Sequence, residues 1–600
     1  MAIRLRRIVL LSTAACTLLF LFWRLQERFV DTTRESVTEE TSSSSYRGRY
    51  GVGPGHLLNP VSSYIPLPTT AQALPRIQHD FKAAAVGRAA GGKTRLARLE
   101  TIKEAMVHSW RGYRENAWLQ DELAPVTRGS RKTLGGWAVT LVDALDTLWL
   151  MGMTAEFDEA VAAVADIDFT TATQLPINVF ETTIRYLGGL IGAYDVSGGR
   201  YPILLDKARE LGDMLYEAFD TQNHMPVTKW SKIGPGIEAP NAQTLIAELG
   251  TLSLEFTRLT QLTGDPRYYD AVQRVTDCLE SQQNQTRFPG LFPHIVNARD
   301  CYFFDGVSFS LGGSADSVYE YFPKEYQLLG GGAEQYRKLY DIAKGPIKSS
   351  ILFRPMTPTN EDILLAGMVK AYRPGHTKLI PQTQHLACFA GGMFALAARM
   401  FDTPEDMETA KKLVRGCIWA YNQTAIGIMP EMLHAVPCSE EHPECPWDQQ
   451  LWAEAMFELN TKDESPEDKL LPEDVRVRQK SHRLRFSKGI SAIADRQYAL
   501  RPEALESIFV LYRITGDESL RDDAWRMFEA IMKQTRTAYG FSSIEDVTVS
   551  ESKKTDRMES FWMAETLKYM WLLFEDPTIV SLDEFVLNTE AHPFRLETAR

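Results

Sequence analysis

The sequence predicts an all-α fold, a single toroid built from stacked pairs of helices, and three observations support that prediction. Apolar residues recur at spacings of three and four from residue 94 onward, which is the period of amphipathic helices. Short turns rich in Gly, Pro and Asp join the helices in pairs, as at residues 263–266 and 515–517. Strand-like runs are few and short, as at residues 294–296 and 351–353, and nothing in the middle of the chain has the composition of a linker.

The apolar periodicity predicts about fourteen helices. They are expected at residues 96–118, 137–151, 179–194, 204–219, 242–262, 266–279, 316–329, 333–347, 384–400, 404–421, 447–457, 502–515, 519–535 and 558–574. One ring of stacked helix pairs fits this pattern better than two domains, because no linker divides the chain.

The composition is that of a globular protein with an acidic surface. Hydrophobic residues make up 44% of the chain and charged residues 24%, which excludes wholesale disorder and a protein with many membrane spans. Lys and Arg number 65 against 78 Asp and Glu, a net charge of −13. Such a chain is poorly suited to phosphate backbones, so we expect no nucleic-acid partner.

The amino terminus predicts a membrane anchor. Arg4, Arg6 and Arg7 precede an apolar run at residues 8–23, and charged residues follow the run. The small residues 14–16 would suit signal-peptide cleavage, but the bulky residues 18–23 would not, so we favour an uncleaved anchor. The run is shorter than the roughly 20 residues of a typical span, which suits the thinner membranes of the early secretory pathway.

The predicted organisation follows from that anchor. A cytosolic tail (residues 1–7) precedes the signal anchor (8–23), a stem (24–90) and a lumenal domain (91–600). We therefore expect a single-pass type II protein of the Golgi or endoplasmic reticulum membrane. Sequons at Asn284 and Asn422 favour the same lumenal location.

The seven cysteines favour disulfides over a metal site. None belongs to a CxxC pair and no His cluster lies beside them, which argues against zinc. Six lie between residues 278 and 445, an even number that could form three disulfides.

Two acidic residues occur where a helical core would tolerate none. Glu181 and Arg185 lie four residues apart in a predicted helix and share one face, so they form either an ordinary ion pair or part of a site. Asp316 opens a helix after the glycine turn 312–313, where a carboxylate either caps the helix or faces a site.

Glu503 is the strongest candidate for a general base. Pro502 is well placed as the first helical residue, which puts Glu503 at the positive end of the helix dipole. That position favours the ionised carboxylate that a general base requires. Glu506 follows one turn later on the same side. First-turn acids that only stabilise the helix are the alternative interpretation.

Two residues near the carboxyl end suggest a hard-metal site. Glu565 lies among aromatic and aliphatic residues, so it is buried or lines a pocket. Thr589 offers a carbonyl and a hydroxyl oxygen, donors that suit calcium and not a soft metal. No EF-hand loop accompanies them.

A set of short motifs extends these observations over most of the chain. They are residues 136–149, Phe180-Glu181, Ala315-Asp316-Ser317, Tyr319-Glu320-Tyr321, His385-Leu386-Ala387-Cys388-Phe389, Leu500-Arg501-Pro502-Glu503, Glu559-Ser560-Phe561 and residues 588–593. In content and order they resemble the class I α-1,2-mannosidases, glycoside hydrolase family 47, from about residue 110 to residue 593. The resemblance implies an (α/α)7 barrel with a few short β-hairpins, in agreement with the helix pattern.

The resemblance also implies an activity. It is that of a calcium-dependent, inverting exo-hydrolase that trims α-1,2-linked mannose from high-mannose N-glycans. Glu503 would be the general base, and Glu181 and Asp316 would share the acid side. An inverting site leaves room for water between acid and base.

The remaining site residues are carried over from the same motifs. Thr589 would bind calcium directly, and Glu503, Glu506, Glu565 and Glu590 would hold its water shell. The sugar would be bound by Arg185, Glu248, Arg501, Phe561 and Glu565.

The resemblance assigns one disulfide, between Cys388 and Cys417. For the rest, proximity in sequence suggests Cys278 with Cys301 and Cys438 with Cys445. Cys16 would lie in the membrane run, unpaired or acylated.

One departure from the family pattern concerns specificity. Members that cleave a single branch carry an arginine two residues before the Asp316 position, where this chain has Ser314. We therefore expect broad trimming of several linkages. Separately, we expect the enzyme to be a monomer. The alternative function is a lectin-like quality-control factor on the same fold that marks misfolded glycoproteins, although this chain keeps all three catalytic acids.

Overall fold

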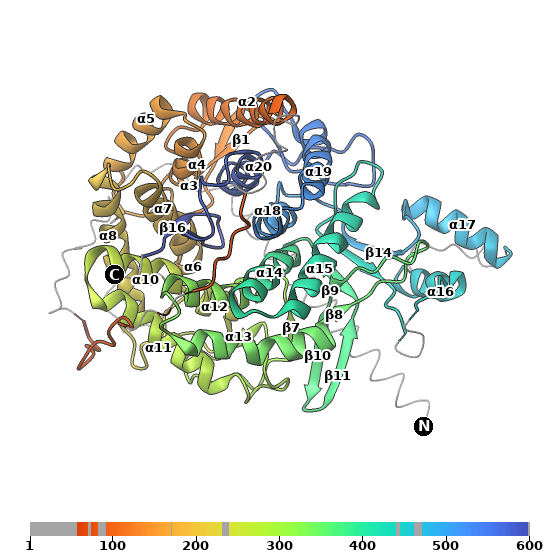
Figure 1. Cartoon of the computed structure of the whole chain (residues 1–600), viewed down its shortest axis with the longest axis horizontal. Helices are drawn as coiled ribbons and strands as arrows, with labels where there is room; N and C mark the ends of the chain where they lie inside the picture. Colours follow the sequence, from red (N-terminus) through yellow and green to blue (C-terminus); the bar gives the residue numbers. More distant parts are fainter. Residues whose placement is uncertain are drawn as a thin grey trace, which may run out of the picture. The chain divides into compact units, whose positions relative to one another are not determined.

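Seven helix pairs form a closed ring in the computed structural model (Figure 1), which describes residues 57–69, 72, 74–81, 92–169, 171–173, 175–230, 239–439, 444–460 and 471–597. The pairs are α4 (Leu145–Leu150) with α5 (Thr154–Ala165), α7 (Gly188–Val196) with α8 (Pro202–Tyr216), α10 (Ser253–Thr263) with α11 (Pro266–Gln282), α12 (Asp316–Leu328) with α13 (Glu334–Pro346), α14 (Ala390–Phe401) with α15 (Pro404–Asn422), α18 (Glu503–Thr515) with α19 (Ser519–Thr535), and α20 (Leu567–Phe574) with α2 (Gly92–Asn116).

In each pair as given, the helix named first lies on the inside of the ring and the helix named second on the outside. These helices contact one another in the order α4, α7, α10, α12, α14, α18 and α20, and the π-helical turn Trp562–Thr566 before α20 closes the ring against α4. Inner helices such as α12 are buried almost along their whole length, whereas outer helices bury one stripe. The structure thus confirms an (α/α)7 barrel.

Short helices and strands connect the pairs. The remaining helices are α3 (Val139–Asp143), α6 (Val179–Glu181), α9 (Ile246–Gly250), α16 (Gln449–Leu459) and α17 (Glu473–Leu484). The strands are β1 (Glu122–Ala124), β2 (Gly129–Arg131), β3 (Ile177–Asn178), β4 (Lys229–Trp230), β5 (Thr244–Leu245), β6 (Ile295–Val296), β7 (Ser308–Ser310), β8 (Leu352–Phe353), β9 (Leu365–Ala366), β10 (Met368–Arg373), β11 (His376–Ile380), β12 (Gln382–Gln384), β13 (Met432–Ala435), β14 (Ile490–Asp495), β15 (Phe585–Leu587) and β16 (Pro593–Arg595).

All described sheets are small and antiparallel. The two largest have three strands, in the orders β11-β10-β7 and β12-β13-β14. The hairpin β15–β16 contacts the inner helices α7 and α12, so the loop between its strands reaches the interior of the ring.

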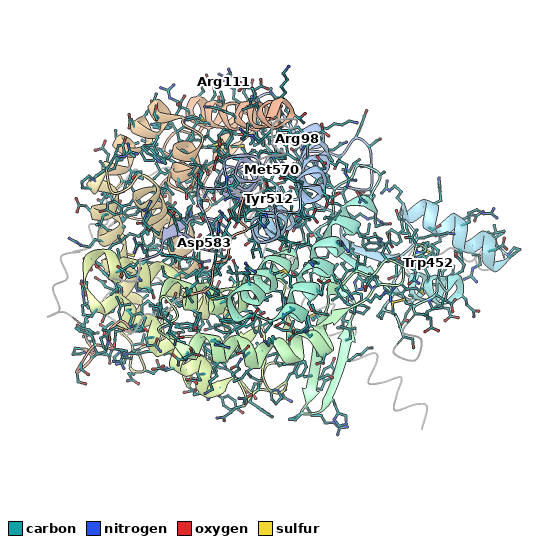
Figure 2. The ribbon with its side chains drawn as sticks, in the orientation of Figure 1. Arg98, Arg111, Trp452, Tyr512, Met570 and Asp583 are labelled. Atoms are coloured by element: carbon teal, nitrogen blue, oxygen red, sulfur yellow. A yellow bond between two sulfur atoms is a disulfide. The ribbon has the colours of Figure 1, made fainter. Side chains whose placement is uncertain are left out.

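The structure contains each of the fourteen predicted helices, with two kinds of difference. Several predicted helices are divided, for example residues 137–151 into α3 and α4, and residues 242–262 into β5, α9 and α10. Two helices were not predicted, α5 and α17. Helix α17 is mostly polar and lies with α16 outside the ring, where Trp452 centres a small separate core (Figure 2).

Three disulfides join the six cysteines between residues 278 and 445. They pair Cys388 with Cys417, Cys278 with Cys301 and Cys438 with Cys445, which confirms all three predicted pairings. Asn284 and Asn422 are both exposed, as a glycosylation acceptor must be.

The predicted anchor, residues 8–23, lies outside the described residues. Among those that are described, no helix combines the length and the apolar character needed to cross a membrane.

Part of the predicted stem lies on the barrel. The main-chain nitrogens of Ile77 and Gln78 donate to Asp583, whose place within the ring is labelled in Figure 2. The Gln78 side chain is buried and accepts from the Arg513 guanidinium at 3.1 Å and from the Leu582 nitrogen at 3.2 Å. This stretch is therefore part of the folded domain.

Gln78→Ala is expected to lower the free energy of unfolding by about 1–3 kcal/mol, because it removes the acceptor of the Leu582 nitrogen and one of the acceptors of the buried Arg513 guanidinium. Thermal unfolding of the purified protein measures the loss. Arg76→Ala, which removes an exposed side chain two residues away, serves as the control and should change the melting temperature little. Equal melting temperatures for Gln78→Ala and the parent would contradict the assigned contact.

Candidate active site

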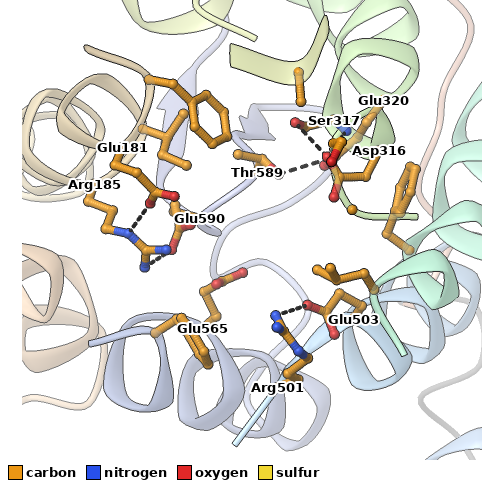
Figure 3. A pocket seen from close by; sticks show the side chains of 18 of the residues that line it. Glu181, Arg185, Asp316, Ser317, Glu320, Arg501, Glu503, Glu565, Thr589 and Glu590 are labelled. Carbon is orange, nitrogen blue, oxygen red and sulfur yellow. Dashed lines mark hydrogen bonds and ion pairs between the residues drawn. The ribbon is translucent and has the colours of Figure 1, made fainter. Parts of the chain in front are cut away.

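One cavity inside the ring gathers every residue for which the sequence predicts catalysis, sugar binding or metal binding. It has a volume of about 340 Å³ (Figure 3). The predicted residues that line it are Glu181, Arg185, Glu248, Asp316, Arg501, Glu503, Glu506, Phe561, Glu565, Thr589 and Glu590. The structure thus brings all eleven together, from segments spread over four hundred residues of chain.

Helix starts and helix irregularities place the acidic side chains. Asp316 and Glu503 occupy the first turns of α12 and α18. The first backbone N–H groups of a helix have no acceptor within it, so the amino terminus of each helix brings positive partial charge to the cavity. Glu181 ends α6 at the start of the π-helical turn Thr182–Leu187, and Glu565 lies in the π-helical turn before α20. Such π-turns displace a side chain from the regular helical register, and they are frequent at functional sites.

Glu503 is a buried carboxylate held in its ionised form. Its Oε2 lies 2.6 Å from His385 Nδ1, and its Oε1 lies 3.5 Å from Arg501 Nη1. Burial raises the pKa of Glu503, but the His385 hydrogen bond and the Arg501 charge outweigh it, and the net pKa is below its ordinary value. Tyr421 contacts the other ring nitrogen of His385 at 2.7 Å and so fixes the ring.

Asp316 has the opposite property. Burial raises its pKa to about 7, and the charges of Glu320 and Glu503 add to that rise against hydrogen bonds from Ser317. Asp316 therefore keeps its proton in mild acid and loses it as the pH rises through about 7. Two carboxyl groups whose environments push their pKa values apart are the usual arrangement of a general acid and a general base.

Glu181 belongs to a network centred on Arg185. The Arg185 guanidinium donates to Glu181 Oε2 at 2.9 Å and to Glu590 Oε2 at 2.8 Å, and lies 3.8 Å from Asp143. Figure 3 shows Glu181, Arg185 and Glu590 together on one side of the cavity. The i,i+4 ion pair expected from the sequence is present, and it also lines the site.

The sugar-binding candidates form the walls. Phe561 lies near both guanidinium groups: its ring centroid is 5.5 Å from Arg185 Cζ and 5.8 Å from Arg501 Cζ. Glu248 accepts from Lys229 at 2.5 Å. These walls combine an apolar ring with hydrogen-bonding groups, as sugar sites do.

Thr589 lines the cavity from the loop between β15 and β16. Its hydroxyl donates to Glu320 Oε2 at 3.0 Å. The loop is held by the buried side chain of Asn588, which donates to Ile184 and Glu255 and accepts from the nitrogens of Glu590 and His592. The Thr589 oxygens are thus presented by a rigid support.

The cavity carries an excess of buried negative charge. Eight carboxylates line it against two guanidinium groups, those of Arg185 and Arg501. Burial, together with neighbouring acids, raises the pKa of Glu565 and of Glu506 well above the ordinary value, and burial raises that of Glu590 to about 7.

This donor set suits a hard cation bound largely through water. Among the described residues, no three His, Cys, Asp or Glu side chains converge closely enough to ligate an ion directly. An oxygen pair on Thr589 with carboxylates one water away is a set that calcium accepts, and its charge would offset the repulsion between the acids.

Sequence reasoning assigned no role to four residues that the structure places at the site, namely Glu320, Lys324, His385 and Glu431. Glu320 lies four residues after Asp316 on the same face of α12, a spacing that could have identified it. Lys324 contacts both Glu320 and Glu506. His385 and Glu431 contact residues 118 and 70 positions away, so no local pattern could have shown these contacts, although His385 belongs to one of the motifs.

Comparison with known proteins agrees with this geometry. Residues 105–596 match the Glycosyl hydrolase family 47. Mannosyl-oligosaccharide alpha-1,2-mannosidase IA of Spodoptera frugiperda is 33% identical over 542 residues, which cover 87% of this chain and 70% of that protein. The endoplasmic reticulum mannosyl-oligosaccharide 1,2-alpha-mannosidase of Homo sapiens is 33% identical over 509 residues, covering 84% of this chain and 64% of that protein.

A solved structure has the same fold. The alpha-1,2-mannosidase from Trichoderma reesei superposes with a TM-score of 0.72 at 30% sequence identity, covering 84% of this chain and 99% of that one. The chain therefore belongs to glycosyl hydrolase family 47.

Proposed function

We propose that the protein is a calcium-dependent, inverting exo-α-1,2-mannosidase that removes terminal α-1,2-linked mannose from high-mannose N-glycans. The observation that carries the proposal is that one cavity of a family 47 chain is lined by both Glu503, whose pKa is lowered, and Asp316, whose pKa is raised to about 7. The names of the related proteins support the substrate class.

The chain's own residues account for the proton transfers. Glu503 takes a proton from the attacking water, which forms the bond to the anomeric carbon as the glycosidic bond breaks. Asp316 supplies the proton that the leaving oxygen needs, with Glu181 on the same acid side. Phe561, Arg185, Glu248, Arg501 and Glu565 bind and orient the terminal sugar.

Thr589 would hold the calcium ion directly, and Glu503, Glu506, Glu565 and Glu590 would hold its water shell. When bound, the ion supplies positive charge that binds sugar hydroxyls and polarises water.

The test is mass spectrometry of a high-mannose oligosaccharide incubated with the purified protein, before and after chelation and return of calcium. Stepwise loss of hexose that stops on chelation and resumes with calcium supports the proposal, and NMR of the first product should show the β-anomer expected of inversion. Binding of the glycan without any hexose loss would favour the lectin-like function instead.

The membrane arrangement is a further part of the proposal. Residues 1–7 would be cytosolic, residues 8–23 the anchor, and the barrel lumenal, in the Golgi or endoplasmic reticulum. The three disulfides support an oxidising compartment. Protease protection in sealed microsomes, together with resistance to carbonate extraction, tests the topology, and the sedimentation of the detergent-free barrel tests the expected monomer.

Activity is expected to fall as the pH rises through about 7. Catalysis needs Glu503 ionised and Asp316 protonated; the lowered pKa of Glu503 keeps it ionised in mild acid, whereas Asp316 loses its proton above its pKa of about 7. A profile of kcat/KM against pH should therefore decline on its alkaline side.

The Ser317→Ala variant sharpens that measurement. The Ser317 hydroxyl donates to Asp316 and lowers its pKa, so its removal should move the alkaline limb to higher pH. An alkaline limb at the same pH in both proteins would remove Asp316 from the acid role and transfer it to Glu181.

Ser314→Arg is expected to narrow the set of linkages that the enzyme removes. Ser314 lines the cavity two residues before Asp316, where a long cationic side chain would occupy space open to neighbouring branches. Some linkages should become at least about tenfold slower than others, measured from the time course of isomeric products. The Ser314→Gln variant adds a long side chain without the positive charge, so it shows whether length or charge causes the narrowing. If Ser314→Arg released the products in the parental order, Ser314 would not explain the breadth of trimming.

A further inference from the structure

The loop that carries Thr589 ends in a buried cluster of charged side chains. This calcium loop, residues 588–592, lies between β15 and β16. Its last residue, His592, has Nδ1 2.8 Å from Asp146 Oδ2 and Nε2 3.0 Å from Asp143 Oδ1. The cluster has four members, all fully buried, and they are Asp143, Asp146, Lys568 and His592. It ties the calcium loop to α3 and α4 of the ring.

The two hydrogen bonds of the His592 ring require its imidazolium form. An ionised carboxylate only accepts hydrogen bonds, whereas a neutral imidazole carries a single N–H. Because each ring nitrogen faces a carboxylate oxygen, both nitrogens must donate. The second oxygen of Asp146 lies 2.8 Å from Lys568 Nζ. Two negative and two positive groups thus compensate one another, which buried charges need in order to be tolerated.

The cluster also holds an unfavourable turn of the calcium loop. Ala591 has a φ of +61°, in the left-handed region that residues other than glycine rarely adopt. Lys568 donates to the carbonyl oxygen of Ala591 at 2.9 Å. Such a backbone conformation persists only where the surrounding structure enforces it. The turn two residues after Thr589 therefore depends on the buried charges.

Two glycines of α7 allow the calcium loop to approach this inner helix closely. A Cβ added at Gly188 would lie 2.6 Å from Asn588 Nδ2 and 2.9 Å from His592 Cδ2. One added at Gly192 would lie 3.0 Å from both His592 Cβ and Asp146 Oδ2. Glycine is disfavoured inside a helix relative to alanine, so its presence at these positions indicates a close approach that a larger residue would disturb.

We infer that His592 is a positioning residue for calcium: as an imidazolium held between two aspartates, it fixes the main chain of the calcium loop and so the two oxygens of Thr589. The inference rests on the proposed function, in which Thr589 binds the ion directly. None of the four charged side chains lines the catalytic cavity, so they act through the loop. A ligand that is already in place loses less conformational freedom on binding, so the calcium affinity should depend on this cluster.

The test measures the Kd for calcium by calorimetry on the purified full-length protein, after chelation and at a temperature where every variant is folded. His592→Gln removes the imidazolium and should raise the Kd at least about tenfold. Gly192→Ala keeps every charge and adds one methyl group against His592, so it tests the same contact if His592→Gln fails to fold. It should raise the Kd at least about threefold.

Two control variants separate calcium binding from stability. Gly92→Ala makes the same substitution at the start of α2, where an added Cβ has nothing within 4 Å, and it should change neither the Kd nor the melting temperature much. Asp406→Asn removes a buried carboxylate that pairs with Lys348 on the outer side of the ring. It should lower the melting temperature and leave the Kd for calcium unchanged.

The parent protein distinguishes the two possible failures. If the parent binds calcium and the folded variants bind it with the parental Kd, the inference is wrong, whatever their melting temperatures, because the cluster would then serve stability alone. If the parent binds no calcium, the calcium dependence in the proposed function is wrong, and the role of His592 falls with it.

Discussion

Glu503→Gln is expected to lower kcat at least about 1,000-fold while leaving the fold and glycan binding intact. The substitution keeps the shape of the side chain, and the amide oxygen still accepts from His385. It removes the negative charge that takes the proton from water. The measurement is hexose release by mass spectrometry, with glycan binding followed separately by calorimetry.

The matched control is Glu529→Gln, which makes the same chemical change at an exposed position of the outer helix α19. It should retain parental turnover and melting temperature. A Glu503→Gln enzyme that turns over at the parental rate would remove Glu503 from the role of base. A variant that loses both turnover and glycan binding would indicate instead that Glu503 mainly orders the cavity through His385 and Arg501.

Much of the ring could be predicted from the sequence because its outer helices bury a periodic stripe. Helices α13, α15 and α19 follow the apolar period closely, since each packs one face against the ring, whereas inner helices such as α12 and α18 are buried almost throughout. The order of the family motifs then predicted the (α/α)7 barrel and the catalytic acids Glu181, Asp316 and Glu503. Those acids lie at helix starts, where capping and catalysis favour the same residue types, so the sequence alone left both open for Asp316 and Glu503.

The rest could not be predicted because it depends on contacts between distant segments. The π-helical turn after Glu181 interrupts a pattern that reads as one continuous helix. The lowered pKa of Glu503 depends on His385, 118 residues away. The contact between Glu122 in β1 and Glu559 joins segments more than four hundred residues apart and has no local signal.

Removing calcium is expected to stop turnover and to lower the melting temperature of the purified full-length protein. Without the ion, the buried carboxylates Glu506, Glu565 and Glu590 repel one another around Thr589. When the free concentration of calcium is about 1,000 times its Kd, binding stabilises the native state by about 4 kcal/mol. For a domain of this size that corresponds to roughly 4 °C. Scanning calorimetry with chelator, with calcium and with magnesium measures the shift.

Thr589→Val tests whether Thr589 is the direct ligand. Valine keeps the shape and the main-chain carbonyl but loses the hydroxyl oxygen, so the calcium concentration needed for half of the thermal shift should rise at least about tenfold. Thr578→Val, which changes an exposed threonine between α20 and β15, is the control and should keep the parental calcium dependence. If Thr589→Val and the parent showed the same calcium-dependent shift, the ion would be held elsewhere. The variant could instead melt at a lower temperature and still respond to calcium as the parent does. That result would mean that Thr589 only supports the loop through its hydrogen bond to Glu320, because losing a direct ligand must change the calcium dependence itself.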